Sequence, residues 1–150
     1  MTASNTKDSF YRTDDVVDLV QKFETCILPH SDWNHVAHLT VAIWYLSQFS
    51  QPEAIARICT GIRRYNHCNS IQMTKNSGYH ETLTLFWIAI ARRFLSTANP
   101  NASVLELVND FILTYGNKKS WFLEYYSYGL IMSWEARQRW VEPDFKPLDE

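Results

Sequence analysis

The chain has 150 residues, 46% of them hydrophobic, and a formal net charge of -2, which suits one globular domain with its own core. It contains six Trp, eight Tyr and eight Phe but only four Gly, so the turn-rich composition of a many-stranded sheet is missing. Lys and Arg are scattered without a basic stripe, which argues against nucleic acid as a partner.

The sequence predicts no membrane contact. The N-terminal segment MTASNTKDSFYRTDD lacks the apolar core of a signal peptide, and the longest apolar runs, VAIWYL and LFWIAIA, are too short to cross a bilayer. The three cysteines, Cys26, Cys59 and Cys68, form no CxxC pair, and their odd number suits a reducing compartment. We therefore expect a cytoplasmic protein.

The N-terminal part is predicted to be a tail followed by a helix. Residues 1–12 are polar and aperiodic, which indicates a flexible tail, and residues 13–150 are predicted to form a single helical domain. The first helix begins behind Thr13, carries apolar residues at helical spacing as far as Ile27, and ends before Pro29.

The second and third helices have recognisable starts. Ser31 or Asp32 is expected to cap a helix that runs to about Phe49 and is apolar around most of its circumference, so it belongs at the centre of the fold. Ser50 and Glu53 have the spacing of a capping box for the next helix.

The rest of the chain completes an all-α bundle of about five to seven helices. Residues 69–78 lack periodicity and are predicted to form a surface loop that closes on the GYHET turn. The further helices are expected over about Tyr79–Leu95, over Ser103–Tyr115 with Gly116 as its stop, over about Ser120–Tyr128, and after Ser133.

The segment WNHVAHL places two histidines on the central helix. His35 and His38 are three residues apart, so their side chains emerge on one face with Cβ atoms about 5–6 Å from each other. Ala42, one turn beyond His38, leaves space beside them. Because an unsatisfied buried polar group costs about 1–3 kcal/mol, two inward imidazoles need partners.

The segment GYHETLT supplies a third histidine and a carboxylate. His80 is expected on the inner side of the fourth helix, and Glu81 lies about 100° further around the axis, from where it can bind a metal, orient a histidine or act as a catalytic base. Three histidines and a carboxylate suit zinc, and two histidines with a carboxylate suit nonhaem iron. The leading hypothesis is a divalent metal centre of His35, His38, His80 and Glu81.

A metal centre of this kind could activate water or oxygen against a small organic molecule. We expect the side chains that contact this molecule to come from the helices and the loop around the histidines. They are Tyr45, Asn66, Tyr79, Thr84 and Trp87.

Two other classes of function stay open. Glu81 in a first helical turn is favoured by the helix dipole alone, His80 can simply cap the turn after Gly78, and the other histidines can bond inside the bundle. The chain would then be a noncatalytic ligand-binding module, or an interaction module whose aromatic surface docks a partner or forms a homo-oligomer. A metal-free enzyme with His38 or His80 as its base is the third alternative.

Four segments together carry a resemblance to a known family. WNHVAHL, IRRYN, GYHETLT and MSWEARQRWVEPDFKPL look like a family of small uncharacterised bacterial proteins that includes cyanobacterial members, and the likeness spans roughly residues 20 to 150. The resemblance implies a bacterial, soluble setting and brings no activity with it. The chain is also similar in general character to helical metalloproteins of the DinB kind, although its histidine spacing differs from theirs.

Overall fold

The computed structural model describes residues 9–148, and this part of the chain is all-helical, with no strand. The all-α prediction is therefore confirmed. The seven α-helices of the described range are α2 (Thr13–Glu24), α3 (His35–Gln48), α4 (Gln51–Cys68), α5 (Glu81–Ser96), α6 (Val104–Tyr115), α7 (Tyr128–Ile131) and α8 (Trp134–Gln138). Two short 3-10 turns, η1 (His30–Asp32) and η2 (Trp121–Glu124), precede α3 and α7.

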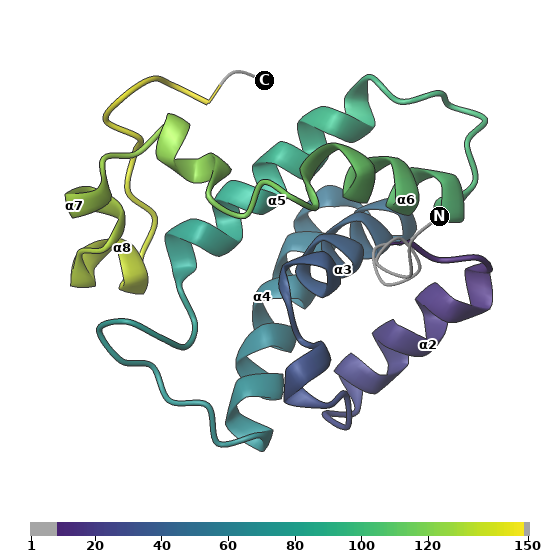
Figure 1. The fold of residues 1–150 in the computed structure, drawn as a ribbon, viewed down its shortest axis with the longest axis horizontal. Coiled ribbons are helices and arrows are strands. Elements are labelled where there is room, and N and C mark those ends of the chain that lie inside the picture. The colour runs from purple at the N-terminus through teal and green to yellow at the C-terminus, as the bar shows by residue number, and fades with distance from the viewer. Residues whose placement is uncertain (1–8, 149–150) are drawn as a thin grey trace.

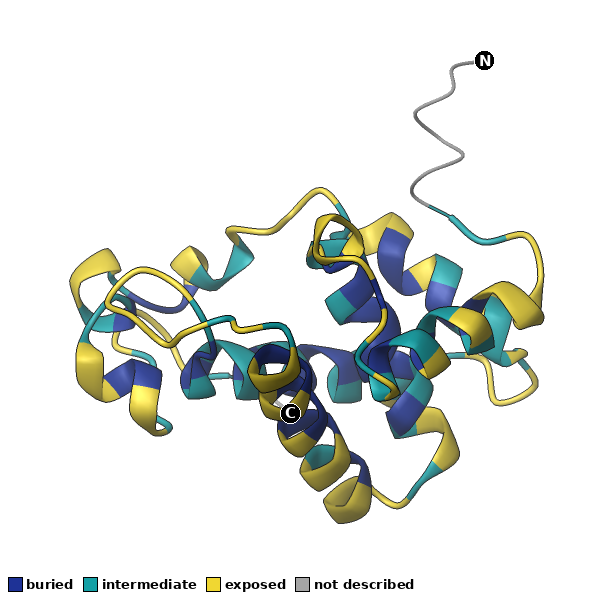
Figure 2. Ribbon diagram, turned by 90° about the horizontal axis from the view of Figure 1, so that it is seen from below, coloured by how far each residue is buried: buried dark blue, intermediate teal, exposed yellow. Residues whose placement is uncertain are grey.

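Helix α3 lies at the centre of the fold, as its all-round apolar surface predicts. It packs against α2, α4, α5 and α6 (Figure 1). One side of α3 contributes Ala37 and Val41 to a core shared with α2 and α4, and another contributes Leu39 and Ile43 to a core shared with α5 and α6. Buried residues gather on the inner sides of the helices, and exposed residues lie on the outer sides (Figure 2).

The junction of α2 and α3 differs from the sequence prediction. Ile27 lies beyond the end of α2 and is 67% exposed, because Cys26 adopts a positive φ of 67° that turns the chain out of the helix. Neither Ser31 nor Asp32 caps α3, since both lie in η1. Asn34 is the cap, and its side-chain oxygen accepts a hydrogen bond of 2.9 Å from the backbone N–H three residues on.

The N-terminal caps of α4 and α6 differ because the glutamate in the first turn of each helix binds a different kind of partner. The predicted box of Ser50 and Glu53 does not form, because the Glu53 carboxylate instead binds Arg57, one turn along α4, at 2.8 Å. At α6 the same type of box forms between Ser103 and Glu106.

The C-terminal region is broken into shorter pieces than predicted. Instead of one helix over residues 120–128, the chain forms η2 and then α7, which Ser127 caps. The Asp144 carboxylate accepts bonds from the backbone N–H and the hydroxyl of Ser127, so the C-terminal segment stabilises this break. Ser133 caps α8, as predicted.

Phe10 lies within the predicted N-terminal tail, of which residues 1–8 are outside the described range. Its backbone N–H and carbonyl both bond to the side chain of Asn109 on α6, at 2.9 Å each. Phe10 is therefore attached to the bundle. Within residues 9–148, no helix has the length and apolar character needed to cross a membrane.

Candidate functional site

The loop between α4 and α5 reaches the site through a turn that requires glycine at position 78. Gly78 has a φ of +85°, and a Cβ atom there would lie 2.3 Å from the carbonyl oxygen of Gln72. Glycine is the residue that accepts both constraints at little cost. The turn is held from outside by Arg137 of α8, whose Nη1 lies 3.0 to 3.3 Å from the carbonyl oxygens of Ser77, Gly78 and Tyr79.

His80 caps α5 and does not belong to its first turn. Its backbone is extended, with φ -135°, and its Nδ1 accepts a hydrogen bond of 3.1 Å from the N–H of Leu83. The other ring nitrogen, Nε2, donates a hydrogen bond of 2.8 Å to the carbonyl of Ile131 at the end of α7. The capping role that the sequence left open is confirmed. This neutral tautomer uses both ring nitrogens, and burial lowers the pKa of His80.

His35 and His38 each donate one hydrogen bond from a ring nitrogen to a backbone carbonyl. His35 Nε2 donates to the Tyr115 carbonyl at 3.0 Å, and His38 Nδ1 donates to the Asn34 carbonyl at 2.7 Å. Burial lowers the pKa of both histidines, that of His38 to about 4, and the charge of Lys119 acts in the same direction. At neutral pH each neutral ring therefore keeps one nitrogen as a hydrogen-bond acceptor.

All three histidines line one cavity of about 450 Å³, here called the main cavity. This volume lies within the range of about 300–1,000 Å³ typical of small-molecule sites. Its wall comes from the η1–α3 segment, α4, the loop to α5, α5 itself, the region after α6, and α8. The lining residues are His30, Trp33, Asn34, His35, His38, Ala42, Ile58, Ile62, Asn66, Ile71, Asn76, Ser77, Gly78, Tyr79, His80, Leu83, Thr84, Trp87, Ile88, Lys119, Phe122 and Arg137.

Among the predicted substrate contacts, the structure brings Asn66, Tyr79, Thr84 and Trp87 to the wall of the main cavity. Tyr45 does not reach it. It lies seven residues after His38, a separation that corresponds to about 10 Å along α3, and its hydroxyl donates to the Glu24 carboxylate of α2. Tyr45 instead packs in the core shared by α2, α3 and α4.

Glu81, predicted as a metal ligand and catalytic group, also lies outside the wall of the main cavity. Its carboxylate lies toward α4, where it accepts a bond from the Tyr79 hydroxyl and lies 3.5 Å from Arg63. Burial and this carboxylate raise the pKa of Tyr79. The Glu81 carboxylate therefore orients Tyr79, and within residues 9–148 it forms no hydrogen bond or ion pair with the three imidazoles.

The predicted metal centre is not assembled by these side chains. No group of three or more His, Cys, Asp or Glu residues within 9–148 is placed to hold a metal ion. The physical reason lies in His80, whose Nδ1 lone pair receives the Leu83 N–H and whose Nε2 carries the proton donated to Ile131. A metal bond to either nitrogen would require the loss of the cap or of the bridge to α7.

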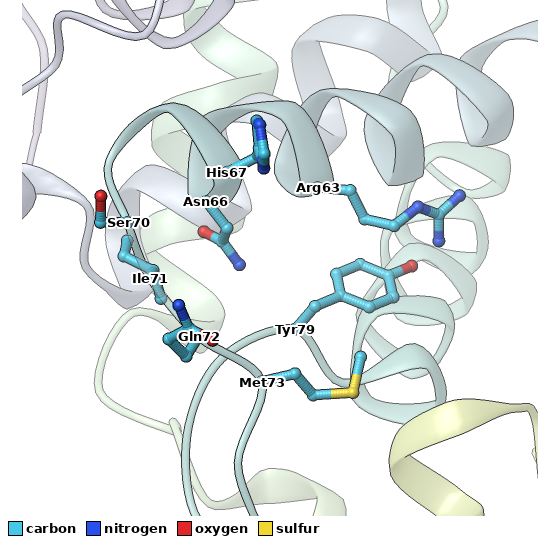
Figure 3. Close-up of a pocket in the computed structure, with 8 residues that line it drawn as sticks. All are labelled: Arg63, Asn66, His67, Ser70, Ile71, Gln72, Met73 and Tyr79. Carbon is cyan, nitrogen blue, oxygen red and sulfur yellow. The ribbon is translucent and has the colours of Figure 1, made fainter.

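Asn66 places an unpaired amide on the wall of the main cavity. It is only 8% exposed, yet its amide forms no hydrogen bond with any residue of the described range. It also lines a smaller adjoining pocket of about 230 Å³, where Figure 3 shows the amide directed from α4 toward the space bounded by Ile71 and Tyr79. An unpaired amide of this kind is costly unless water or a ligand satisfies it.

Two cations of the cavity wall were not predicted from the sequence. Lys119 follows α6, and Arg137 lies on α8 within the SWEARQRW segment. No local pattern marks either residue as a site residue. The loop carbonyls that Arg137 contacts are about 60 positions away in the sequence, so their proximity depends entirely on the fold.

Comparison of the chain with known protein families, with curated proteins and with solved structures gave no match.

Proposed function

We propose that this protein binds a small organic molecule in the main cavity. The observation that carries the proposal is the unpaired amide of Asn66, a residue only 8% exposed, on the wall of a cavity of about 450 Å³. Apolar cavities with a few unsatisfied polar groups are typical of ligand sites, since the polar groups orient the ligand and the apolar wall supplies affinity.

The aromatic wall suits a molecule with a flat apolar part. The Trp33 ring stacks on His38 with a centroid separation of 3.8 Å, and the Trp87 ring meets His35 edge-on at 4.9 Å. These contacts restrain both imidazoles, so the wall is formed before a ligand arrives. A preformed wall reduces the entropy lost on binding.

The pKa of His38 and the hydrogen bonds of His80 favour a role in ligand binding over one in acid/base catalysis. A general base works best when its pKa lies near the working pH, whereas the pKa of His38 is lowered to about 4. His80 has no free ring nitrogen with which to take up a proton. The open nitrogens of His35 and His38 are suited to accept hydrogen bonds from a ligand.

The uncharged fluorophore N-phenylnaphthylamine tests the proposal, because its emission rises in apolar cavities. We expect saturable binding of one molecule per chain. Thr84→Phe should fill part of the main cavity and weaken binding about tenfold or more, a loss of about 1.4 kcal/mol. The matched control is Thr60→Phe, at an exposed position of α4 that lines neither pocket.

Equal binding by wild type, Thr84→Phe and Thr60→Phe would place the fluorophore elsewhere and refute the proposal. Absence of saturable binding to wild type would refute it as well. Circular dichroism of the two variants must first show that both retain the helical fold.

A further inference from the structure

Arg137 is a buried cation without a counter-charge. It is 5% exposed, and no Asp or Glu of residues 9–148 forms an ion pair with it. Burial lowers its pKa, with no opposing contribution from an acidic group. A buried charge without a counter-charge is unfavourable unless hydrogen bonds and a bound ion of opposite charge compensate for it.

One edge of the Arg137 guanidinium is already used, and the other edge is open. Nη1 contacts the three loop carbonyls, whereas Nε and Nη2 form no hydrogen bond with the described residues. Trp121 Nε1 is the sole fully enclosed, unpaired side-chain nitrogen or oxygen of the described range, so Nε and Nη2 of Arg137 stay accessible. The N–H groups of this edge are parallel and match the two oxygens of a carboxylate.

The main cavity, which Arg137 lines, carries positive charge only. Lys119 and Arg137 are the formally charged residues of its wall, and no Asp or Glu contributes to the described lining. The remaining wall includes the rings of Trp33, Trp87 and Phe122. A cationic ligand would meet like charges here, whereas an anion would be attracted.

We infer that the molecule bound in the main cavity is a carboxylate with a flat apolar body, whose carboxylate oxygens accept hydrogen bonds from Nε and Nη2 of Arg137. The inference rests on the binding function proposed above and names the class of its ligand. The apolar body contacts the aromatic wall, and the Asn66 amide offers a further hydrogen bond.

Three probes of nearly equal shape test the inference by isothermal titration calorimetry at neutral pH. They are naphthoate, naphthamide and naphthylmethylammonium, substituted at the same ring position, with charges of -1, 0 and +1. We expect naphthoate to bind about tenfold or more tightly than naphthamide, because hydrogen bonds between two charged groups are stronger than those to a neutral amide. Naphthylmethylammonium should bind most weakly.

Variants then locate the charge that is responsible. Arg137→Met should reduce the preference for naphthoate over naphthamide to the two- to fivefold that Lys119 contributes. Because Arg137 also holds the loop carbonyls, Lys119→Gln provides a second test at an exposed position, and it should weaken naphthoate about two- to fivefold while leaving naphthamide unchanged. Lys118→Gln is the matched control, since Lys118 carries the same charge one position away and does not line the main cavity.

The outcomes separate the two proposals. If naphthamide binds as tightly as naphthoate while N-phenylnaphthylamine still requires the unfilled cavity, the carboxylate inference is overturned and the binding function stands. If Lys118→Gln weakens naphthoate as much as Lys119→Gln does, the attraction is a general surface effect and the inference is again overturned. If neither the fluorophore nor any naphthalene probe binds, both proposals fail.

Discussion

Replacing His80 by alanine should lower the free energy of unfolding by about 2–4 kcal/mol. The substitution removes the side-chain cap on the Leu83 N–H, which contributes about 1 kcal/mol. It also leaves the Ile131 carbonyl without its 2.8 Å partner in a buried position, at a cost of about 1–3 kcal/mol. A natural domain has a total stability of about 5–15 kcal/mol, so the effect is large.

Two further variants divide this loss into its parts. His80→Asn retains an oxygen that can cap α5 but is too short to reach Ile131, so it should cost about 1–3 kcal/mol. Ser103→Ala removes an ordinary side-chain cap from α6, with no bridge to another helix, and should cost about 1 kcal/mol.

Urea unfolding followed by far-UV circular dichroism measures all three variants against wild type. The expected order of destabilisation is His80→Ala first, then His80→Asn, then Ser103→Ala. A His80→Ala variant that loses no more stability than Ser103→Ala would show that the bridge to α7 contributes nothing. The structural role assigned to the second ring nitrogen would then be wrong.

Three further predictions concern pH, metal and the loop. The pKa of His38 is lowered by burial, with smaller effects of His35 and Lys119, from 6.5 to about 4, so the unfolded chain takes up the proton first as pH falls. The neutral His38 therefore contributes about 1–3 kcal/mol to the free energy of unfolding above pH 6.5, and this contribution is lost as the pH falls toward 4. In urea unfolding, the stability of His38→Gln should decline less than that of wild type between pH 6.5 and 4. An equal decline would contradict the assignment. EDTA should leave the melting temperature unchanged. If stoichiometric zinc raised the melting temperature of wild type but not that of His38→Ala, the predicted metal centre would be supported after all. Gly78→Ala should cost about 1–3 kcal/mol because of its positive φ, while Gly129→Ala, where an added Cβ meets no atom within 4 Å, should be neutral or stabilising in urea unfolding.

The sequence by itself determined most of the helices and the position of α3. Apolar periodicity and capping residues are local signals, because they depend on backbone geometry within one or two turns. Prediction from these signals fails where another nearby residue binds the capping side chain, as at Glu53, which binds Arg57 and not the backbone at the helix start. It also fails where a distant group intervenes, as at Ser127, which Asp144 holds from the C-terminal segment.

Spacing along α3 also places His35 and His38 on one face, and both do line the same cavity. Only the tertiary structure decided what each imidazole does there. The state of His80 depends on a carbonyl of α7 that is 51 residues away, because this bond keeps the proton on Nε2 while the Leu83 N–H occupies the lone pair of Nδ1. Arg137 reaches the cavity from a similar distance along the chain, with a charge that no local pattern marks as functional. Local periodicity determines the direction of a side chain, whereas its partners, its protonation and its charge environment depend on contacts between distant segments.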